Sequence, residues 1–143
     1  MKNIPALDHA DAWAALTVVR EVIMKENKPL VIVIVDSHGE IMALFRHTDA
    51  MLSSITVATN KAYTAARLRR PSVAVGQKSR SAAEGFDISS FGDPRVTGFG
   101  GGLPILSNGR VIGGVGVSGL PEADDIAIAE LAISAIEASW KTC

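Results

Sequence analysis

The sequence predicts an α+β domain in which helices flank an antiparallel sheet. Two pairs of strand-like segments are each joined by a short turn, and the elements follow the order helix, two strands, two helices, two strands, helix. Turns this short favour antiparallel pairing, because a parallel crossover needs about a dozen residues or more. A doubly wound parallel sheet is the alternative. The length of 143 residues predicts a single domain over residues 1–143.

The first part of the chain predicts one helix and one strand pair. The helix is expected between Asp8, a residue type that caps helix N-termini, and Asn27. Its apolar stripe has helical spacing and consists of Ala12, Leu16, Val19 and Ile23. The six aliphatic residues 30–35 predict a central strand covered on both faces, and residues 41–46 are expected to return beside it after a turn at 36–39.

The middle of the chain predicts two more helices. The first covers about residues 53–69 and carries a face of small residues, which allows close approach to a neighbour: Ala58, Ala62, Ala65 and Ala66. Pro71 ends it. A shorter helix is expected over 72–84, closed by Gly85, and residues 86–98 are rich in turn formers.

A glycine-rich hairpin over residues 99–119 is the most distinctive pattern. Asn108-Gly109 between two apolar runs is typical of a two-residue type I′ turn. In the strand after the turn, alternate side chains point to opposite faces. One face then carries Val111, Gly113, Val115 and Val117. The other carries Ile112, Gly114, Gly116 and Ser118. The second face is nearly bare, so we expect another backbone or a ligand to approach it closely. A last helix is expected from Pro121 onward.

Three motif interpretations of this hairpin are excluded by context. The segment 114–119 matches G-x-G-x-x-G, but no later strand supplies the acidic residue that a dinucleotide fingerprint needs. The glycines 100–102 are not followed by the Gly-Lys-Ser/Thr of a phosphate-binding loop. Ser118 lacks the second glycine of a nucleophile elbow.

Composition limits the class of protein. Fourteen basic and fifteen acidic residues give a net charge of −1, which implies no general attraction to nucleic acid or to acidic membranes. No apolar run is long enough to span a membrane, and no signal peptide is recognisable. Cys143 is the only cysteine, which excludes an internal disulfide framework. We therefore expect a cytoplasmic protein.

Three side chains are candidates for binding a small ligand. Asp36 ends the buried strand, where it either accepts a ligand hydroxyl or fixes the following turn. Arg46 is expected near the same end of the sheet, where it either grips a carboxylate or pairs with Asp36 or Asp49. Lys61 lies on the small-residue helix and is either a ligand contact or a solvated cation.

The backbone around the hairpin is a candidate anion site. Gly100, Gly101 and Gly102 lead into the hairpin, and Ser118 leaves it beside a helix N-terminus. Unpaired amide hydrogens at both places suit a carboxylate, whereas tight packing is the competing explanation. A basic cluster is also a candidate for propionates or phosphates, with a solvated helix end as the alternative: Arg67, Arg69, Arg70, Lys78 and Arg80.

The histidines do not form a metal pair. His9, His38 and His47 lack the helical i, i+4 spacing of a dedicated site, so structural zinc is not expected. Each remains a weak candidate for a haem ligand, since one axial ligand suffices. The acids Asp124 and Asp125 in the first turn of the last helix are either catalytic carboxylates or acids stabilised there by the helix dipole.

Several segments together resemble the GlcG/HbpS-like family, which includes the C-terminal domain of PduO-type corrinoid adenosyltransferases. They are residues 33–39, Arg46, 61–65, 101–105 and 111–119, with the acidic pair 124–125. The resemblance covers almost the whole chain and implies a profilin-like or PAS-like sheet in a homo-oligomer. It also implies a role in binding haem or a related tetrapyrrole, accessory to glycolate, diol or glycerol metabolism in some members.

Two other functions stay open. One is an enzyme that acts on a small carboxylate or a diol-derived metabolite, with Arg46 and Lys61 holding the anion and Asp36 as base. The other is a structural assembly subunit without a ligand. Whether the chain catalyses any reaction is left undecided by the sequence, because fold and family do not define a mechanism.

Overall fold

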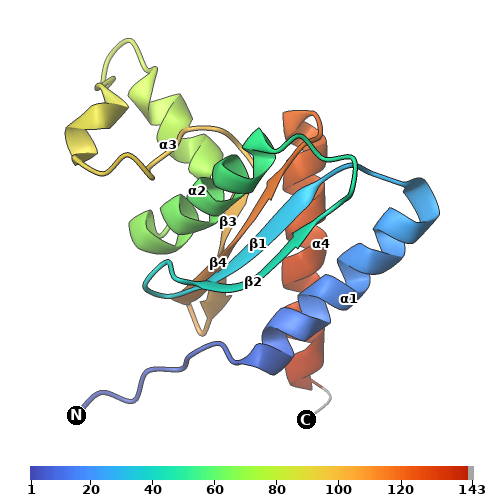
Figure 1. Cartoon of the computed structure of the whole chain (residues 1–143). Helices are drawn as coiled ribbons and strands as arrows, with labels where there is room; N and C mark the ends of the chain where they lie inside the picture. The colour runs from blue at the N-terminus through green and yellow to red at the C-terminus, as the bar shows by residue number, and fades with distance from the viewer. Residues whose placement is uncertain (142–143) are drawn as a thin grey trace.

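The computed structural model describes residues 1–141, so the prediction about Cys143 lies outside the described part of the chain. A central sheet is covered by α1 and α4 on one face and by α2 and α3 on the other (Figure 1). The elements are α1 (His9–Glu26), β1 (Val31–Asp36), β2 (Ile41–Arg46), α2 (Ser53–Leu68), α3 (Ser72–Ser79), the 3-10 helix η1 (Ile88–Phe91), β3 (Gly102–Ser107), β4 (Arg110–Ser118) and α4 (Glu122–Lys141).

The sheet has four strands in the order β2-β1-β4-β3, and every neighbouring pair is antiparallel. The predicted α+β class and element order are confirmed. Residues 31–35 of β1 are 0% exposed, because helices cover both faces of this inner strand. Alternate residues enter two separate cores. Ile32 and Ile34 pack with α1 and α4, whereas Val31, Val33 and Val35 pack with the alanines of α2.

The glycines of β4 bring α2 against the sheet. A Cβ atom at Gly114 would lie 2.5 Å from the Ala62 carbonyl oxygen, and one at Gly116 would lie 2.1 Å from the Ala58 carbonyl oxygen. Both positions are therefore filled by the backbone of α2, which confirms the close backbone approach predicted for this face.

The predicted alternation along β4 is wrong at Ile112. This residue is buried in the same core as Val115 and Val117, rather than facing α2. The register of β3 and β4 shifts between Ile105 and Leu106, so Ile112 is an extra residue on β4. A β-bulge of this kind reverses the inside-outside phase of the strand, which alternation alone does not reveal.

Helix boundaries follow the predicted signals with one correction. The side chain of Asp8 caps α1, and Asn108 and Gly109 have the positive φ values of 49° and 76° that a type I′ turn requires. The helix expected over 72–84 ends at Ser79 instead. The Phe86 amide bonds to the Ser79 carbonyl oxygen, so the chain turns back at this point.

Within residues 1–141, no helix is long and apolar enough to cross a membrane.

Candidate functional site

A buried ion pair joins α2 to α4 beyond the end of β4. Lys61 Nζ lies 3.0 Å from Asp125 Oδ2 and donates a second hydrogen bond of 2.8 Å to the carbonyl oxygen of Val117. Both charged side chains are only 4% exposed. Lys61 extends from α2 to the Val117 carbonyl oxygen of β4. The small residues that bring α2 close to β4 therefore also position its ammonium group.

The environment of Asp125 explains how a carboxylate is tolerated there. Burial raises the pKa of Asp125, and the Lys61 ammonium, hydrogen-bonded to the carboxylate, opposes that increase. The second oxygen, Oδ1, accepts a hydrogen bond of 3.0 Å from the Leu120 amide, just before α4 begins. Asp125 therefore links the end of β4, the start of α4 and Lys61.

The glycine segment 100–102 wraps around this pair. The Gly100 amide donates to Glu122 Oε2 at 3.2 Å, and the Gly102 amide donates to Ser72 Oγ at 2.9 Å. Gly101 has φ +124°, and a Cβ atom there would lie 2.6 Å from the Val117 oxygen and 2.9 Å from Lys61 Nζ. A side chain at Gly101 is thus excluded by both conformation and contact. The amides of Gly100 and Gly102 are therefore paired within the chain and not unpaired as expected, and the binding of a ligand anion by this segment stays a prediction.

A hollow of about 280 Å³ opens beside the ion pair. It brings together three of the residues that the sequence identified as ligand-binding candidates, Lys61, Gly100 and Ser118. The other lining residues are Ser54, Val57, Phe99, Gly119, Leu120, Glu122 and Asp125. Sequence reasoning missed Asp125 as the partner of Lys61, because the two residues are 64 positions apart.

Asp36 and Arg46 do not meet, and the expectation that they share one end of the sheet is wrong. Arg46 pairs with Val31, which also pairs with Ser118, whereas Asp36 pairs with Gly113 at the opposite end. An antiparallel hairpin places the end of its second strand beside the start of the first. Asp36 Oδ1 accepts hydrogen bonds from the amides of His38 and Glu40, at 2.8 and 3.1 Å, and so fixes the β1–β2 turn.

The three histidines lie in three different parts of the fold. His9 is the exposed first residue of α1, and His38 lies in the β1–β2 turn with its side chain 82% exposed. His47 is buried. Its Nδ1 accepts from the Asp49 amide at 3.0 Å, and its Nε2 lies 2.9 Å from Asn27 Oδ1. Both ring nitrogens of His47 are therefore engaged within the chain. Residues 1–141 contain no group of three or more His, Cys, Asp or Glu that would hold a metal ion.

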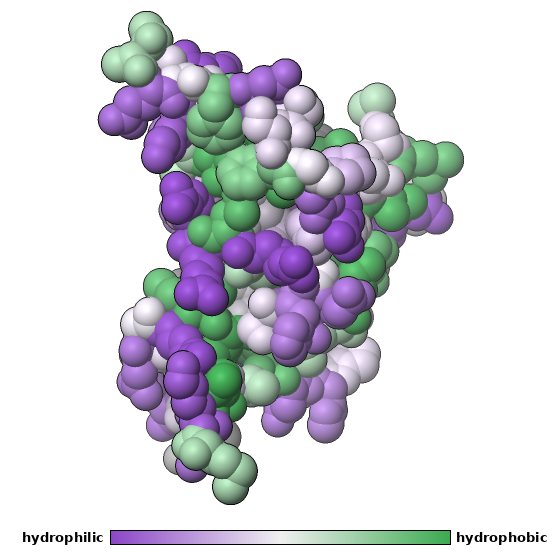
Figure 2. Space-filling model, turned by 90° about the vertical axis from the view of Figure 1, so that its left-hand side faces the viewer, coloured by the Kyte–Doolittle hydropathy of each residue, from purple (hydrophilic) through white to green (hydrophobic). Residues whose placement is uncertain are grey.

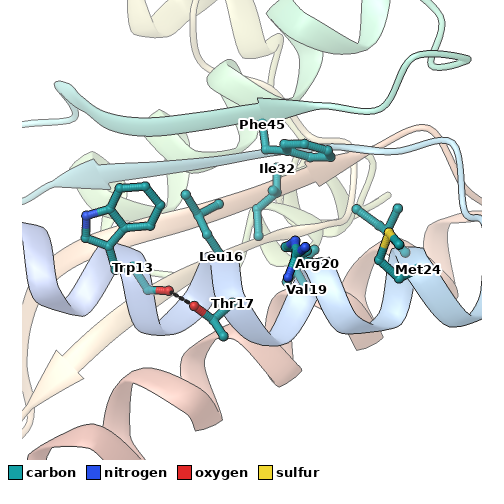
Figure 3. Close-up of a pocket in the computed structure, with 9 residues that line it drawn as sticks. Trp13, Leu16, Thr17, Val19, Arg20, Met24, Ile32 and Phe45 are labelled. Carbon is teal, nitrogen blue, oxygen red and sulfur yellow. Dashed lines mark hydrogen bonds between the residues drawn. The ribbon is translucent and has the colours of Figure 1, made fainter.

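An apolar groove of about 310 Å³ runs between α1 and the edge strand β2. Trp13 and Met24 rise from α1 at the two ends of the groove, and Phe45 projects from β2 above it (Figure 3). Trp13 is 66% exposed and Met24 74% exposed, which is unusual for large apolar side chains. Leu16, Val19, Ile23 and Ile32 form the rest of the apolar lining.

Sequence reasoning missed this groove, although a signal was present. Trp13, Thr17, Arg20 and Met24 have helical spacing and form a second stripe beside the buried stripe of α1. Arg20 is the cationic residue of the lining. His9 precedes Trp13 by four residues and therefore lies one helical turn from it on the same face. The groove thus combines aromatic walls, one cation and a nearby imidazole.

These features define a small three-layer α+β domain with a hollow beside a buried ion pair and an apolar groove between α1 and β2. The chain belongs to the haem-degrading protein HbpS-like family, whose model matches residues 7–134. This agrees with the resemblance seen in the glycine hairpin and the β1–β2 turn.

Three relatives of known sequence are similar to most of the chain. It is 37% identical over 107 residues to an uncharacterized 15.0 kDa protein from the dhaT-dhaS intergenic region of Citrobacter freundii, covering 75% of each chain. It is 35% identical to the corrinoid adenosyltransferase PduO of Salmonella typhimurium over 76% of this chain but only 32% of PduO. It is 30% identical to the protein GlcG of Escherichia coli, covering 82% of this chain and 85% of GlcG.

Solved structures share this fold, and two of them are similar over almost the whole chain. The Klebsiella pneumoniae protein ORFY has a TM-score of 0.89 and 27% identity, covering 96% of this chain and 95% of its own. The PduOC:haem complex has a TM-score of 0.84 and 31% identity, covering 92% of this chain and 95% of its own.

Proposed function

We propose that the protein binds haem or a related tetrapyrrole in the groove between α1 and β2. The observation that carries this proposal is the groove itself, which offers the flat aromatic side chains of Trp13 and Phe45 and a single guanidinium, Arg20. A tetrapyrrole is a flat apolar macrocycle with carboxylate side chains, so it matches both features. Family membership and the haem complex of the similar chain PduOC support a ligand-binding role.

The residues present fit such a group. Trp13 and Phe45 would contact the faces or edge of the macrocycle, and Arg20 would pair with a propionate. His9 is the best placed of the three histidines for the iron, because His47 has both ring nitrogens engaged and His38 lies in the β1–β2 turn. The groove volume of about 310 Å³ is small for a ligand site, so part of the macrocycle would stay uncovered by this chain.

An absorbance titration with haemin tests the proposal. We expect a saturable Soret shift with one equivalent per chain, weakened in Trp13→Ala and changed in position in His9→Ala. Leu106→Ala is the matched control, because Leu106 is also a large exposed apolar residue, at 43%, but does not line the groove and lies on β3, at the opposite edge of the sheet. A non-saturable shift, or equal losses in all three variants, would contradict specific binding in the groove.

The iron-ligand assignment is tested with the remaining histidines. His38→Ala and His47→Ala are expected to keep the Soret position of the unaltered protein. If His38→Ala alone loses it, the site lies at the β1–β2 turn rather than in the groove.

A second candidate function is an enzyme acting on a small carboxylate or diol-derived metabolite. The buried Lys61 at the edge of a hollow favours it, since such ammonium groups hold anions or carbonyls. Asp36 does not serve as its base, because it lies at the opposite end of the sheet. Loss of a thermal shift by glycolate in Lys61→Met would support this function. An accessory role in glycolate, diol or glycerol metabolism is part of the proposal, and a ligand-free assembly subunit is the alternative to both functions.

We also propose that the chain forms a homo-oligomer through the free edge of β2. Large apolar residues are exposed on this edge strand and on the loop that follows it: Ile41, Leu44, Phe45, Met51 and Leu52. An unpaired strand with an apolar surface is a template for association, and native proteins usually protect or use such edges. A second copy on this edge would also cover the part of the groove that faces β2.

A further inference from the structure

A third hollow, of about 520 Å³, lies at the end of the sheet opposite to Lys61. It forms where the β1–β2 turn, the end of α2 and the β3–β4 hairpin meet, and we call it the basic hollow. Its polar lining consists of Ser37, His38, Arg69, Asn108 and Arg110, and its apolar lining of Ile4, Ala66 and Val111, with Gly109 at the turn. Hydrophilic side chains gather across the middle of this side of the molecule (Figure 2).

The ionisable side chains that line the basic hollow are all basic. Two arginines and one histidine line it, and its lining contains no aspartate or glutamate. A carboxylate that adjoins this lining is that of Asp36, whose Oδ1 lies 3.9 Å from His38 Nδ1. That oxygen already accepts hydrogen bonds from two amides of the β1–β2 turn, so it holds the turn and does not neutralise the arginines.

Neither arginine has a partner in the part of the chain that the structure describes. No hydrogen bond or ion pair within residues 1–141 involves the guanidinium of Arg69 or Arg110. Arg95, in contrast, bonds to both oxygens of Asp93 at 3.0 and 3.1 Å. The donors of Arg69 and Arg110 are therefore available for an anion in the hollow.

The backbone at Arg69 adds an independent observation. This residue follows α2 in the left-handed conformation, with φ 58°, where glycine or asparagine is favoured and other residues cost about 1 kcal/mol or more. The helix dipole favours a cation at this end of α2, but asparagine or glycine would end the helix with less backbone strain. The neighbouring Arg67 has a different task, because it donates to the His38 carbonyl oxygen at 3.0 Å and braces the turn.

The structure also divides the basic cluster that the sequence indicated. Arg70 and Lys78 line another hollow beside Phe86 and Phe91, which Arg69 does not line. Arg110, which no sequence pattern linked to the cluster, joins Arg69 because the hairpin places it there. The cationic pair is a product of the fold.

We propose that the basic hollow binds a small, multiply charged oxyanion, with Arg69 and Arg110 donating to it from α2 and from the hairpin. Guanidinium groups bind phosphate and carboxylate oxygens in pairs of hydrogen bonds, and the two share this chemistry. His38, Ser37 and Asn108 supply further polar contacts. The site is separate from the α1–β2 groove and does not depend on the binding of a tetrapyrrole.

Calorimetric titration of the full chain with inorganic pyrophosphate and, separately, with citrate tests this site at constant ionic strength. We expect saturable binding of at least one of them, and the comparison distinguishes a phosphate from a carboxylate ligand. Arg69→Gln and Arg110→Gln should each weaken binding about tenfold or more, as expected for the loss of a charge-assisted contact. Arg20→Gln, which removes the same charge from the α1–β2 groove, is the matched control and should bind as the unaltered protein does.

Arg69→Asn separates binding from folding. Asparagine tolerates the left-handed conformation, so this variant should keep or increase its Tm while binding weakens as it does in Arg69→Gln. Absence of saturable heat with either anion would overturn the proposal. Equal weakening in Arg20→Gln would overturn it too, because the effect would then come from net charge. Haemin binding that persists in both arginine variants would leave the proposed function of the groove standing in either case.

Discussion

Lys61 and Asp125 meet 3.0 Å apart in a place that water scarcely reaches, with both side chains 4% exposed. The pair connects α2 to the first turn of α4, and the additional bond from Lys61 to the Val117 oxygen connects both to the end of β4. Three segments that are distant in sequence thus share one electrostatic contact. The contact also forms one wall of the hollow beside Gly100 and Ser118.

We expect Lys61→Met to lower the free energy of unfolding by about 3–5 kcal/mol, because it leaves the carboxylate of Asp125 buried without its cation. Asp125→Asn should also destabilise, and the double variant should lose less than the sum of the two. Urea denaturation of the four proteins measures the coupling. Additive losses would show that the pair contributes no coupling energy.

The Lys61→Met variant should also change how stability depends on pH. Burial raises the pKa of Asp125, and removal of Lys61 removes what opposes that increase. A carboxyl group with a raised pKa in the folded state stabilises the fold at acidic pH, and this contribution is lost as pH rises through the folded pKa. The deficit of Lys61→Met relative to the unaltered protein should therefore shrink as the pH falls through the raised folded pKa, and it should be smallest below about pH 4, near the unfolded pKa of an aspartate. A deficit that does not vary with pH would contradict this explanation.

Gly116→Ala should be among the most damaging single-methyl additions in the chain. Its Cβ atom would lie 2.1 Å from the Ala58 oxygen and 2.6 Å from the Ala62 nitrogen, so α2 would have to move off the sheet. A loss of more than about 2 kcal/mol is expected from overpacking. Gly109→Asn is the control, because a Cβ atom there meets nothing within 4 Å and asparagine tolerates the φ of +76°. Thermal unfolding of both variants provides the comparison, and similar losses would refute the packing explanation.

Arg20→Gln should weaken haemin binding about tenfold but leave the binding of haemin dimethyl ester unchanged. The ester lacks the carboxylates that Arg20 would contact in the groove, so only the charged form should detect the substitution. Parallel absorbance titrations measure both affinities. Equal weakening for acid and ester would show that Arg20 acts through packing, and no weakening for either would remove it from the site.

The segment 86–98 should loosen at acidic pH. The hydrogen bonds from Arg95 and from the Tyr63 hydroxyl to Asp93 lower the pKa of that carboxyl, and the Arg95 guanidinium stacks 4.1 Å from the centre of the Tyr63 ring. A lowered pKa stabilises the fold above the unfolded value, and the contribution is lost as pH falls through the folded value. Hydrogen exchange of this segment should therefore quicken at acidic pH, after correction for the pH dependence of the intrinsic rate. In Asp93→Asn it should be fast, with little of that acid dependence. Identical exchange profiles in both proteins would show that Asp93 does not hold this segment in place.

Leu44→Lys should shift the protein to a smaller species in sedimentation velocity. Leu44 is 40% exposed on the free edge strand β2, where a lysine charge opposes association. Leu131→Lys makes the same change on α4, where Leu131 is 36% exposed, and should leave the sedimentation coefficient unaltered. A monomer in the unaltered protein, or equal shifts in both variants, would contradict an interface on β2.

Local patterns in the sequence were sufficient for the element order and for the antiparallel pairing. The Asn108-Gly109 turn, the aliphatic run 31–35 and the Asp8 cap each act over a few neighbouring residues, and each lies where it was predicted. The bare face at Gly114 and Gly116 was also readable, because a missing side chain implies a close neighbour. In contrast, the bulge at Ile112 depends on pairing with β3 and has no local signature.

By itself, then, the sequence determined the α+β class, the antiparallel hairpins and the family of this chain. Only the tertiary structure decided which charges meet. It paired Lys61 with Asp125, separated Arg46 from Asp36, and placed Arg69 and Arg110 around one hollow at the end of the sheet. The packing of α1 beside β2 also formed the α1–β2 groove. The physical reason is that backbone preferences act within a few residues, whereas an ion pair or a hollow depends on how strands align and how helices pack over the whole chain.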